Sequence, residues 1–137
     1  MQNSKRAFTL VELLAVVLIV AILAAIMMPL LSGRIEKAKW SEANAGAGII
    51  RTAVRTYFIE KPLQAQTLSG TLDTAAIQAV LGFDPQDLAG TYFVPGDYNI
   101  DSVNAQGIAV ITVTGGSLAN SPAGSYSLAA NGSWQKN

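Results

Sequence analysis

The clearest pattern along the chain is a long apolar run near its N-terminus. Within residues 8–31 the only polar side chains are those of Thr9 and Glu12. A helix of these 24 residues would be about 36 Å long, which is enough to cross a bilayer core of about 30 Å. We therefore expect a membrane-spanning helix, and the carboxylate of Glu12 is a feature that such a helix does not need.

Two basic residues, Lys5 and Arg6, stand just before the apolar run. Membrane proteins carry an excess of positive charge on the cytoplasmic side, so this placement favours a cytoplasmic N-terminus. The chain after Ser32 is then expected outside the cytoplasm.

Two simpler interpretations of the run are a secretory signal peptide and a plain signal anchor. A signal peptide has an apolar core of about 7 to 15 residues and then a small-x-small cleavage site. Here the run is longer, and the pairs Ala21/Leu23 and Ala24/Ile26 lack a small residue at the second place. A plain anchor needs only length and flanking charge, so it leaves Glu12 unexplained.

Downstream of the run, apolar residues recur with a period close to 3.6. This pattern predicts that the helix continues through residues 32–61 with one apolar face and with Arg51 off that face. Small residues at positions 43–48 would let the helix backbone come close to another element, either the sheet of the chain's own head or a neighbouring helix. Pro62 should end the helix near Lys61. The expected apolar face consists of Ile35, Ala38, Ala43, Ala47, Ile50, Val54 and Tyr57.

Residues 62–137 have the pattern of a small globular head. We expect a loop at residues 63–69 and then a short helix that Asp73 caps and that Gly82 stops. Strands are expected at residues 91–94, 98–101, 108–114 and 126–129. An antiparallel sheet laid across the amphipathic helix would let both bury their apolar faces, so the predicted fold class is α+β.

The composition narrows the function. The chain has no cysteine and no histidine, which removes disulfides, thiol catalysis and the commonest general base. Its net charge of zero is unlike that of a nucleic-acid binder, which usually has a basic surplus. The charges are unevenly placed, since residues 34–61 carry six cations while residues 62–135 carry five aspartates and no Lys or Arg. This polarity could help like copies associate, and we expect no enzyme, no cofactor and no nucleic-acid partner.

The stretch KRAFTLVELL, from Lys5 to Leu14, resembles the processing site of type IV prepilins and of the pseudopilins of type II secretion. In that family a short basic leader ends in Gly, Phe usually follows, and a Glu stands at the fifth position after the cut. The resemblance implies a leader at residues 1–7, cleavage between Ala7 and Phe8, and N-methylation of Phe8 by a prepilin peptidase/methyltransferase. Ala7 stands where the family has Gly, and we expect cleavage to survive because alanine has the next smallest side chain.

The resemblance also implies roles for Glu12 and Pro29. After cleavage the Phe8 amine would be a cation one helical turn from Glu12. It could pair with Glu12 of its own chain or of a neighbour, and pairing with a neighbour would fix the axial register of a filament. A carboxylate that reaches the membrane surface without a function is the third alternative. Pro29 weakens the helix near Ala25, either as a plain kink or as a stretch that loses helicity when subunits pack.

The function implied is that of a structural subunit of a type IV pilus-like filament, polymerised through residues 8–31 with the help of an inner-membrane assembly platform. A type II secretion pseudopilin and an anchored extracytoplasmic binding module that does not polymerise are the alternatives. The chain would be a single-pass inner-membrane protein before assembly and part of an extracellular pilus or a periplasmic pseudopilus afterwards. Its partners would be copies of itself or other pilins.

Two motifs in the head have a structural explanation beside a functional one. Asp97, Asn99 and Asp101 form the D-x-N-x-D opening of a calcium loop without the later Gly and Glu of an EF-hand, so a polar strand edge is the alternative to a weak calcium site. Asn131-Gly132-Ser133 is a glycosylation sequon and also a favoured hairpin turn, and we expect the turn.

The aromatic side chains are expected to pack the helix against the sheet. Strand pairing around Trp134 should close the C-terminal tail, because the family's frequent C-terminal disulfide is missing here. The aromatic residues concerned are Trp40, Tyr57, Phe58, Tyr92, Phe93, Tyr98, Tyr126 and Trp134.

Overall fold

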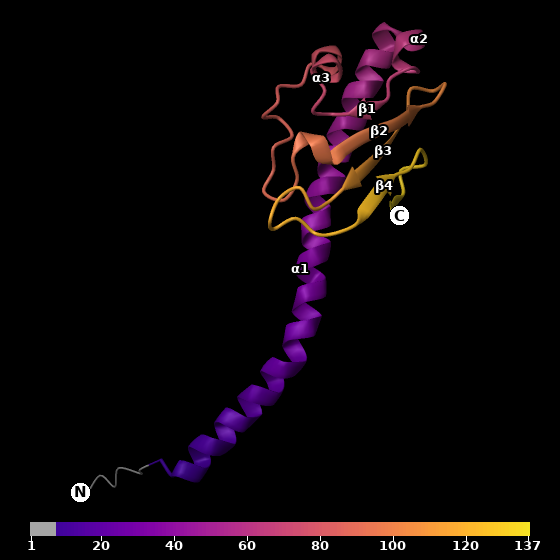
Figure 1. The fold of residues 1–137 in the computed structure, drawn as a ribbon. Coiled ribbons are helices and arrows are strands. Elements are labelled where there is room, and N and C mark those ends of the chain that lie inside the picture. The colour runs from indigo at the N-terminus through magenta and orange to yellow at the C-terminus, as the bar shows by residue number, and fades with distance from the viewer. Residues whose placement is uncertain (1–7) are drawn as a thin grey trace, which may run out of the picture. The chain divides into compact units, whose positions relative to one another are not determined.

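The computed structural model describes residues 8–137 of the chain. They fall into two compact units, one ending at Glu36 and the other comprising Lys37–Asn137. The elements (Figure 1) are, in chain order, helix α1 (Leu10–Glu60), helix α2 (Pro62–Ala65), strand β1 (Gly70–Thr71), helix α3 (Ala75–Leu81), the 3-10 turn η1 (Pro95–Asp97) and strands β2 (Tyr98–Val103), β3 (Ala109–Thr114), β4 (Ser125–Leu128) and β5 (Trp134–Lys136).

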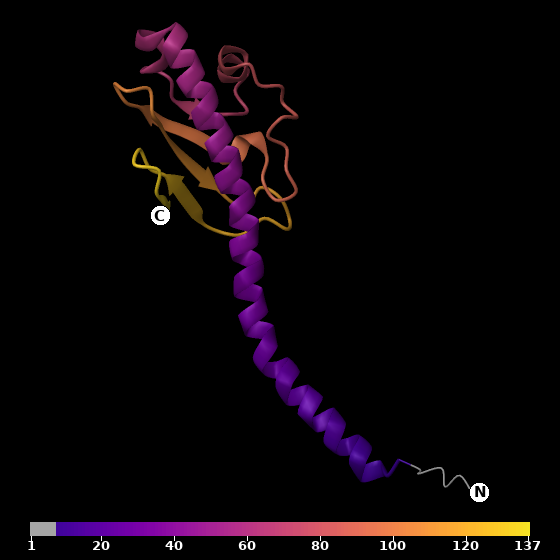
Figure 2. The ribbon, with the colours of Figure 1, turned by 180° about the vertical axis from the view of Figure 1, so that it is seen from behind.

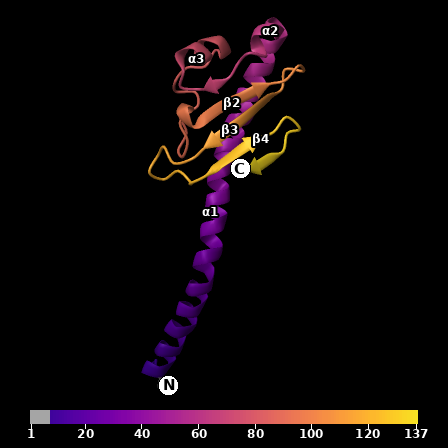
Figure 3. The same ribbon diagram turned by 45° about the vertical axis from the view of Figure 1, so that its right-hand side comes forward.

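The second unit is built on one antiparallel sheet. Its strand order is β1-β2-β3-β4-β5, so each strand pairs with the next strand along the chain (Figure 3). The part of α1 that belongs to this unit packs on one face of the sheet, as the view from behind shows (Figure 2). A long helix packed on a small antiparallel sheet confirms the predicted α+β fold class.

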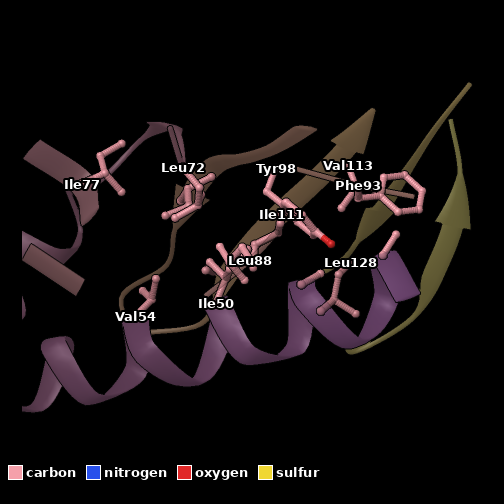
Figure 4. Close-up of a cluster of buried hydrophobic side chains, with 14 of the residues drawn as sticks. Ile50, Val54, Leu72, Ile77, Leu88, Phe93, Tyr98, Ile111, Val113 and Leu128 are labelled. Atoms are coloured by element: carbon pink, nitrogen blue, oxygen red, sulfur yellow. The ribbon is translucent and has the colours of Figure 1, made fainter. Parts of the chain in front are cut away.

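The core of this unit lies between α1 and the sheet. Ile50 and Val54 of the helix are fully buried, as are Ile111 and Val113 of β3 (Figure 4). Side chains alternate along β3, so that Ala109, Ile111 and Val113 face the helix. The buried residues of α1 are Trp40, Ala43, Gly46, Ala47, Ile50 and Val54.

The apolar face of the helix starts later than predicted. Ile35 is 47% exposed and Ala38 is also exposed, so this part of the prediction was wrong. The buried stripe begins at Trp40, and Ala38 lies two residues earlier, about 200° around the helix. Over a few residues a 3.6-residue period fits more than one face, and only the contact with the sheet selects one of them.

Gly46 lies where the helix and the sheet approach most closely. A Cβ atom on Gly46 would lie 2.7 Å from Cζ of Tyr98, whereas a Cβ on Gly48 would meet no atom within 4 Å. Gly46 therefore faces the sheet of its own head, which is one of the two expected partners of the small residues. Burial raises the pKa of Tyr98, and the carboxylates of Glu42 and Asp97 raise it further, so the phenol stays neutral.

Arg51 adds polar contacts beside the apolar stripe. Its Nε donates to the carbonyl oxygen of Ala109 at 3.0 Å, and its Nη2 donates to those of Leu128 and Ala129 at 2.8 and 2.7 Å. Partial burial lowers the pKa of the guanidinium, which stays charged at neutral pH because its usual value is far above 7. One side chain of α1 thus holds the start of β3 and the end of β4.

The strand predicted at residues 91–94 is absent from the sheet, and this prediction was wrong. The backbone N–H groups of Tyr92 and Phe93 donate to Oε1 of Glu42 at 2.9 and 3.2 Å. A side chain of α1 therefore satisfies this backbone in place of a neighbouring strand. Phe93 is fully buried, so the apolar residue in this stretch marks burial and not strand pairing.

Several boundaries were predicted correctly and others were not. Helix α1 ends at Glu60 before Pro62, and Gly82 closes α3 with a left-handed φ of 73°. The cap of α3 is Thr74 and not Asp73, and it makes no side-chain capping hydrogen bond. The expected loop at residues 63–69 contains the short helix α2, since Pro62 suits the first turn of a helix.

The C-terminal tail closes by strand pairing, as predicted. Strand β5 pairs with β4, and Trp134 lies opposite Leu128. Between these strands, Gly132 adopts a φ of 86° and Oδ1 of Asn131 accepts the Ser133 N–H at 2.9 Å, which confirms the expected turn. The five aromatic residues Trp40, Phe93, Tyr98, Tyr126 and Trp134 form one cluster, with ring centroids of contacting pairs 4.4 to 6.5 Å apart.

Replacing Gly46 by alanine should destabilise the second unit, because the new Cβ must displace the ring of Tyr98 in a closely packed core. Overpacking of this kind costs about 1–3 kcal/mol. The matched control is Gly48→Ala, where the space is open and alanine should stabilise the helix by up to about 1 kcal/mol. Denaturant unfolding of the full chain in detergent, followed by tryptophan fluorescence, measures both variants. Equal effects of the two substitutions would contradict the close approach of helix and sheet.

Candidate functional site

The first unit contains the apolar run of residues 8–31. Every large apolar side chain between Phe8 and Leu31 is 53% to 81% exposed. By length and composition alone, α1 is the one described helix that is apolar enough to cross a membrane. A helix that is apolar on all sides needs apolar surroundings, which a membrane or other apolar helices can supply.

A reciprocal pair of side chains fixes the start of α1. The N–H and the hydroxyl of Thr9 donate to Oε2 of Glu12 at 2.9 and 2.8 Å, and the Glu12 N–H donates to the Thr9 hydroxyl oxygen at 3.2 Å. This is a capping box, in which Thr9 is the N-cap and Glu12 is the third residue of the helix. This capping role was not predicted, although the spacing Thr-x-x-Glu before an apolar run is a sufficient signal for it.

The capping box uses only one oxygen of the Glu12 carboxylate. Within residues 8–137, the other oxygen, Oε1, accepts no hydrogen bond and forms no ion pair. Among the described residues, the carboxylate is therefore held in place on one side and open on the other. An open carboxylate oxygen on an otherwise apolar surface is suited to pair with a cation.

The predicted cleavage site lies at the edge of the described chain. Phe8 precedes the first turn of α1 and is 76% exposed, whereas Ala7 lies outside the described residues. The exposed Phe8 stands one residue before the N-cap Thr9 and four residues before Glu12.

Pro29 lies inside α1, which continues through it. Because proline has no N–H, the helix lacks one hydrogen bond to the carbonyl of Ala25. Downstream, the Ser32 hydroxyl donates to the Pro29 carbonyl oxygen at 3.0 Å. The hydroxyl of Ser32 thus adds a hydrogen bond on the C-terminal side of Pro29. The loss of helicity before Pro29 stays a prediction.

The three candidate calcium ligands are not brought together. Asp97 is buried in η1, where its oxygens accept hydrogen bonds from the Val94 N–H, at 2.9 Å, and from the Ser117 hydroxyl. Asn99, which is half-buried, and Asp101, which is exposed, lie on strand β2, and the Asn99 amide donates to Oδ1 of Asp101 at 2.6 Å. Across residues 8–137, no group of three or more Asp, Glu or His side chains is close enough to hold a metal ion.

Comparison with known proteins identifies the N-terminal segment. The family model of the prokaryotic N-terminal methylation motif matches residues 2–28. No curated protein and no solved structure gives a significant match to the chain. The matched residues include the capping box, the exposed Phe8 and most of the apolar segment. The chain therefore carries the prepilin-type N-terminal motif of type IV pilins and pseudopilins.

Proposed function

We propose that the chain is a structural subunit of a type IV pilus-like filament that polymerises through its apolar N-terminal helix. The observation that carries the proposal is the methylation motif at residues 2–28 on a helix whose apolar side chains are exposed on all sides. This motif points to a structural protein rather than to an enzyme. Residues 1–7 would be the leader, 8–31 the membrane and filament-core helix, 32–61 its amphipathic continuation, and 62–137 the head.

Processing would come first. A prepilin peptidase/methyltransferase would cut between Ala7 and Phe8 on the cytoplasmic side and methylate the new Phe8 amine. The mature chain would wait in the inner membrane, with its head outside the cytoplasm, until an assembly platform adds it to a filament. In both places the apolar side chains of residues 8–31 would be covered, first by lipid and then by neighbouring helices.

Glu12 would set the position of each incoming subunit. Its free Oε1 would accept the Phe8 amine of a neighbouring chain, and any other stagger would leave a charge unpaired in apolar surroundings. The capping box supports this proposal because Thr9 already fixes the carboxylate at the helix start. Pro29 would allow residues before it to lose helicity when subunits pack, because the hydrogen bond to Ala25 is missing.

The pilus and the secretion pseudopilus share all of these features. A pseudopilin would form a periplasmic filament in place of an extracellular one, by the same cleavage and the same helix packing. An anchored binding module that does not polymerise would need the membrane helix but not the charge of Glu12.

Mass spectrometry of the protein from its native membrane should find a chain that begins at Phe8 and is heavier by one methyl group, about 14 Da, than the unmodified residue. Replacing Ala7 by glycine, the residue of the family, should leave the same mature mass. A chain that retains Met1 in isolated filaments would contradict processing.

Replacing Glu12 by glutamine should reduce the yield of sheared filaments more than about tenfold, because the charge that pairs with the Phe8 amine is lost. Glutamine keeps an oxygen that can accept from Thr9, so the capping box is retained. Thr9→Val does the reverse, since it removes the two hydrogen bonds of the Thr9 hydroxyl and keeps the charge. Its yield should fall only about twofold, because a less firmly held carboxylate loses more conformational entropy when it pairs. The matched control is Glu36→Gln, which neutralises an exposed carboxylate on the same helix.

Two results would decide against this role of Glu12. Normal filaments from Glu12→Gln would show that the charge is dispensable for assembly. Loss of filaments from Thr9→Val, with normal assembly of Glu12→Gln, would assign the effect to the cap instead.

A further inference from the structure

The second unit has a groove with an aromatic floor, which is called the aromatic groove below. It has a volume of about 270 Å³ and lies between α1 and the strands β4 and β5. The Tyr126 ring is 4.4 Å from that of Trp40 and 5.4 Å from that of Trp134, with which it is nearly parallel at 16°. Trp40 is almost fully buried, while Tyr126 and Trp134 are only half-buried and open to the groove.

One face of α1 forms the rim of the aromatic groove. Lys37, Ser41 and Asn44 are spaced by four and three residues, which places them along one side of the helix. In the part of the chain that the structure describes, none of these side chains forms a hydrogen bond or an ion pair. Lys39 differs, because it donates to the Asn120 carbonyl oxygen at 2.7 Å and lies over the Tyr92 ring. The groove therefore combines an apolar ring surface with one available cation.

The same unit projects a turn with the opposite properties, at residues 84–87, called the acidic turn below. Its sequence is Asp84-Pro85-Gln86-Asp87, and all four residues are exposed. The Asp84 N–H donates to Oδ2 of Asp87 at 2.8 Å, the Gln86 N–H to Oδ1 of Asp84 at 3.1 Å, and the Asp87 N–H to the Asp84 carbonyl oxygen at 3.0 Å. Each carboxylate keeps its second oxygen for other partners. Leu88, which is buried, anchors the turn in the core.

We infer that the acidic turn of one copy docks into the aromatic groove of a second copy. Pro85 would pack on the Tyr126 and Trp134 rings, as proline rings do in aromatic-lined grooves. Asp84 and Asp87 would face Lys37, and opposite charges at the rim select this partner over others. A groove of about 270 Å³ suits one proline ring with its flanking groups. The acidic turn is already fixed by three hydrogen bonds, so docking would cost little conformational entropy.

The contact would link copies in an open series. The acidic turn and the aromatic groove are different surfaces, so the contact is heterologous and leaves one of each free at the ends of any row. This inference rests on the proposed filament, to which it adds a contact between heads. The uneven charge of the chain, with its cations before its aspartates, would then contribute to the contact between copies.

Cysteine cross-linking tests the contact directly, because the chain has no cysteine of its own. A full chain with Ser41→Cys in the groove and Gln86→Cys in the turn should give a ladder of dimers and larger products when sheared filaments are oxidised. Mixed filaments of the two single variants should give dimers only. The matched control pairs Gln86→Cys with Thr56→Cys, which lies outside the groove, about 22 Å further along α1, and should give no ladder.

The outcomes separate this inference from the proposed function. Filaments that form normally without the Ser41–Gln86 cross-link overturn the inference and leave the filament proposal standing. Equal maleimide labelling of the groove cysteine in monomers and in filaments also overturns the inference. If that cysteine is protected from maleimide in filaments but forms no cross-link, a different group occupies the groove, and the inference is overturned as well. A processed, unaltered chain that never enters filaments overturns the proposed function itself.

A charge exchange gives a second, independent measurement. Gln86→Lys adds a cation to the turn without removing any of its hydrogen bonds, and should lower filament yield about threefold, because it offsets part of the attraction of Asp84 and Asp87 to Lys37. Lys37→Glu should lower the yield more strongly, because its carboxylate would face Asp84 and Asp87. In that background Gln86→Lys should raise the yield instead of lowering it. The control Gln66→Lys adds the same charge at another exposed glutamine. Equal loss in this control, or no rescue in the double variant, would overturn the contact.

Discussion

Helix α1 carries two apolar surfaces that must be covered in different ways, and the rest of the chain follows from this constraint. Up to Leu31 the helix is apolar on all sides, and its side chains are exposed. From Trp40 onwards the sheet buries one apolar stripe of the helix. The chain's own head can satisfy the second surface, whereas the first needs lipid or other helices.

The helix–sheet interface works because the helix presents small residues to large ones. Ala43, Gly46 and Ala47 are fully buried or nearly so, and Gly46 leaves the space that the Tyr98 ring fills. Long polar side chains then act at the borders of this contact. Arg51 binds three carbonyl groups of the sheet region, and Glu42 binds the backbone of residues 92 and 93. Apolar packing brings the layers together, and these hydrogen bonds fix the loops around them.

Sequence patterns predicted the features that depend on neighbouring residues. The apolar run, the end of α1 before Pro62, strands β2 to β4 and the turn at Asn131 are all local in this sense. Features that depend on distant residues were not predictable. The stretch at residues 91–94 has strand-like residues, but Glu42, some fifty residues earlier, binds its backbone. Strand β1 has only two residues and exists because β2 pairs with it.

The candidate sites also differ in whether they depend on neighbouring or on distant residues. The D-x-N-x-D spacing would place three ligands on one strand face, but Asp97 lies in η1, before the strand begins. Its buried carboxylate accepts hydrogen bonds from the Val94 N–H and the Ser117 hydroxyl instead. The aromatic groove joins residues from Lys37 to Trp134, so no window of sequence contains it. The capping box, by contrast, spans four residues and was legible as Thr-x-x-Glu.

The cap and the proposed pairing of Glu12 reinforce each other. A glutamate side chain that was free to rotate would lose conformational entropy when it bound a cation, and this loss would weaken the pairing. Thr9 has already fixed the carboxylate through Oε2, so the remaining oxygen is presented in a set direction. The helix N-terminus also favours a negative charge at this place. Under the proposed function, the glutamate of the capping box would thereby be a preorganised receptor for an amine.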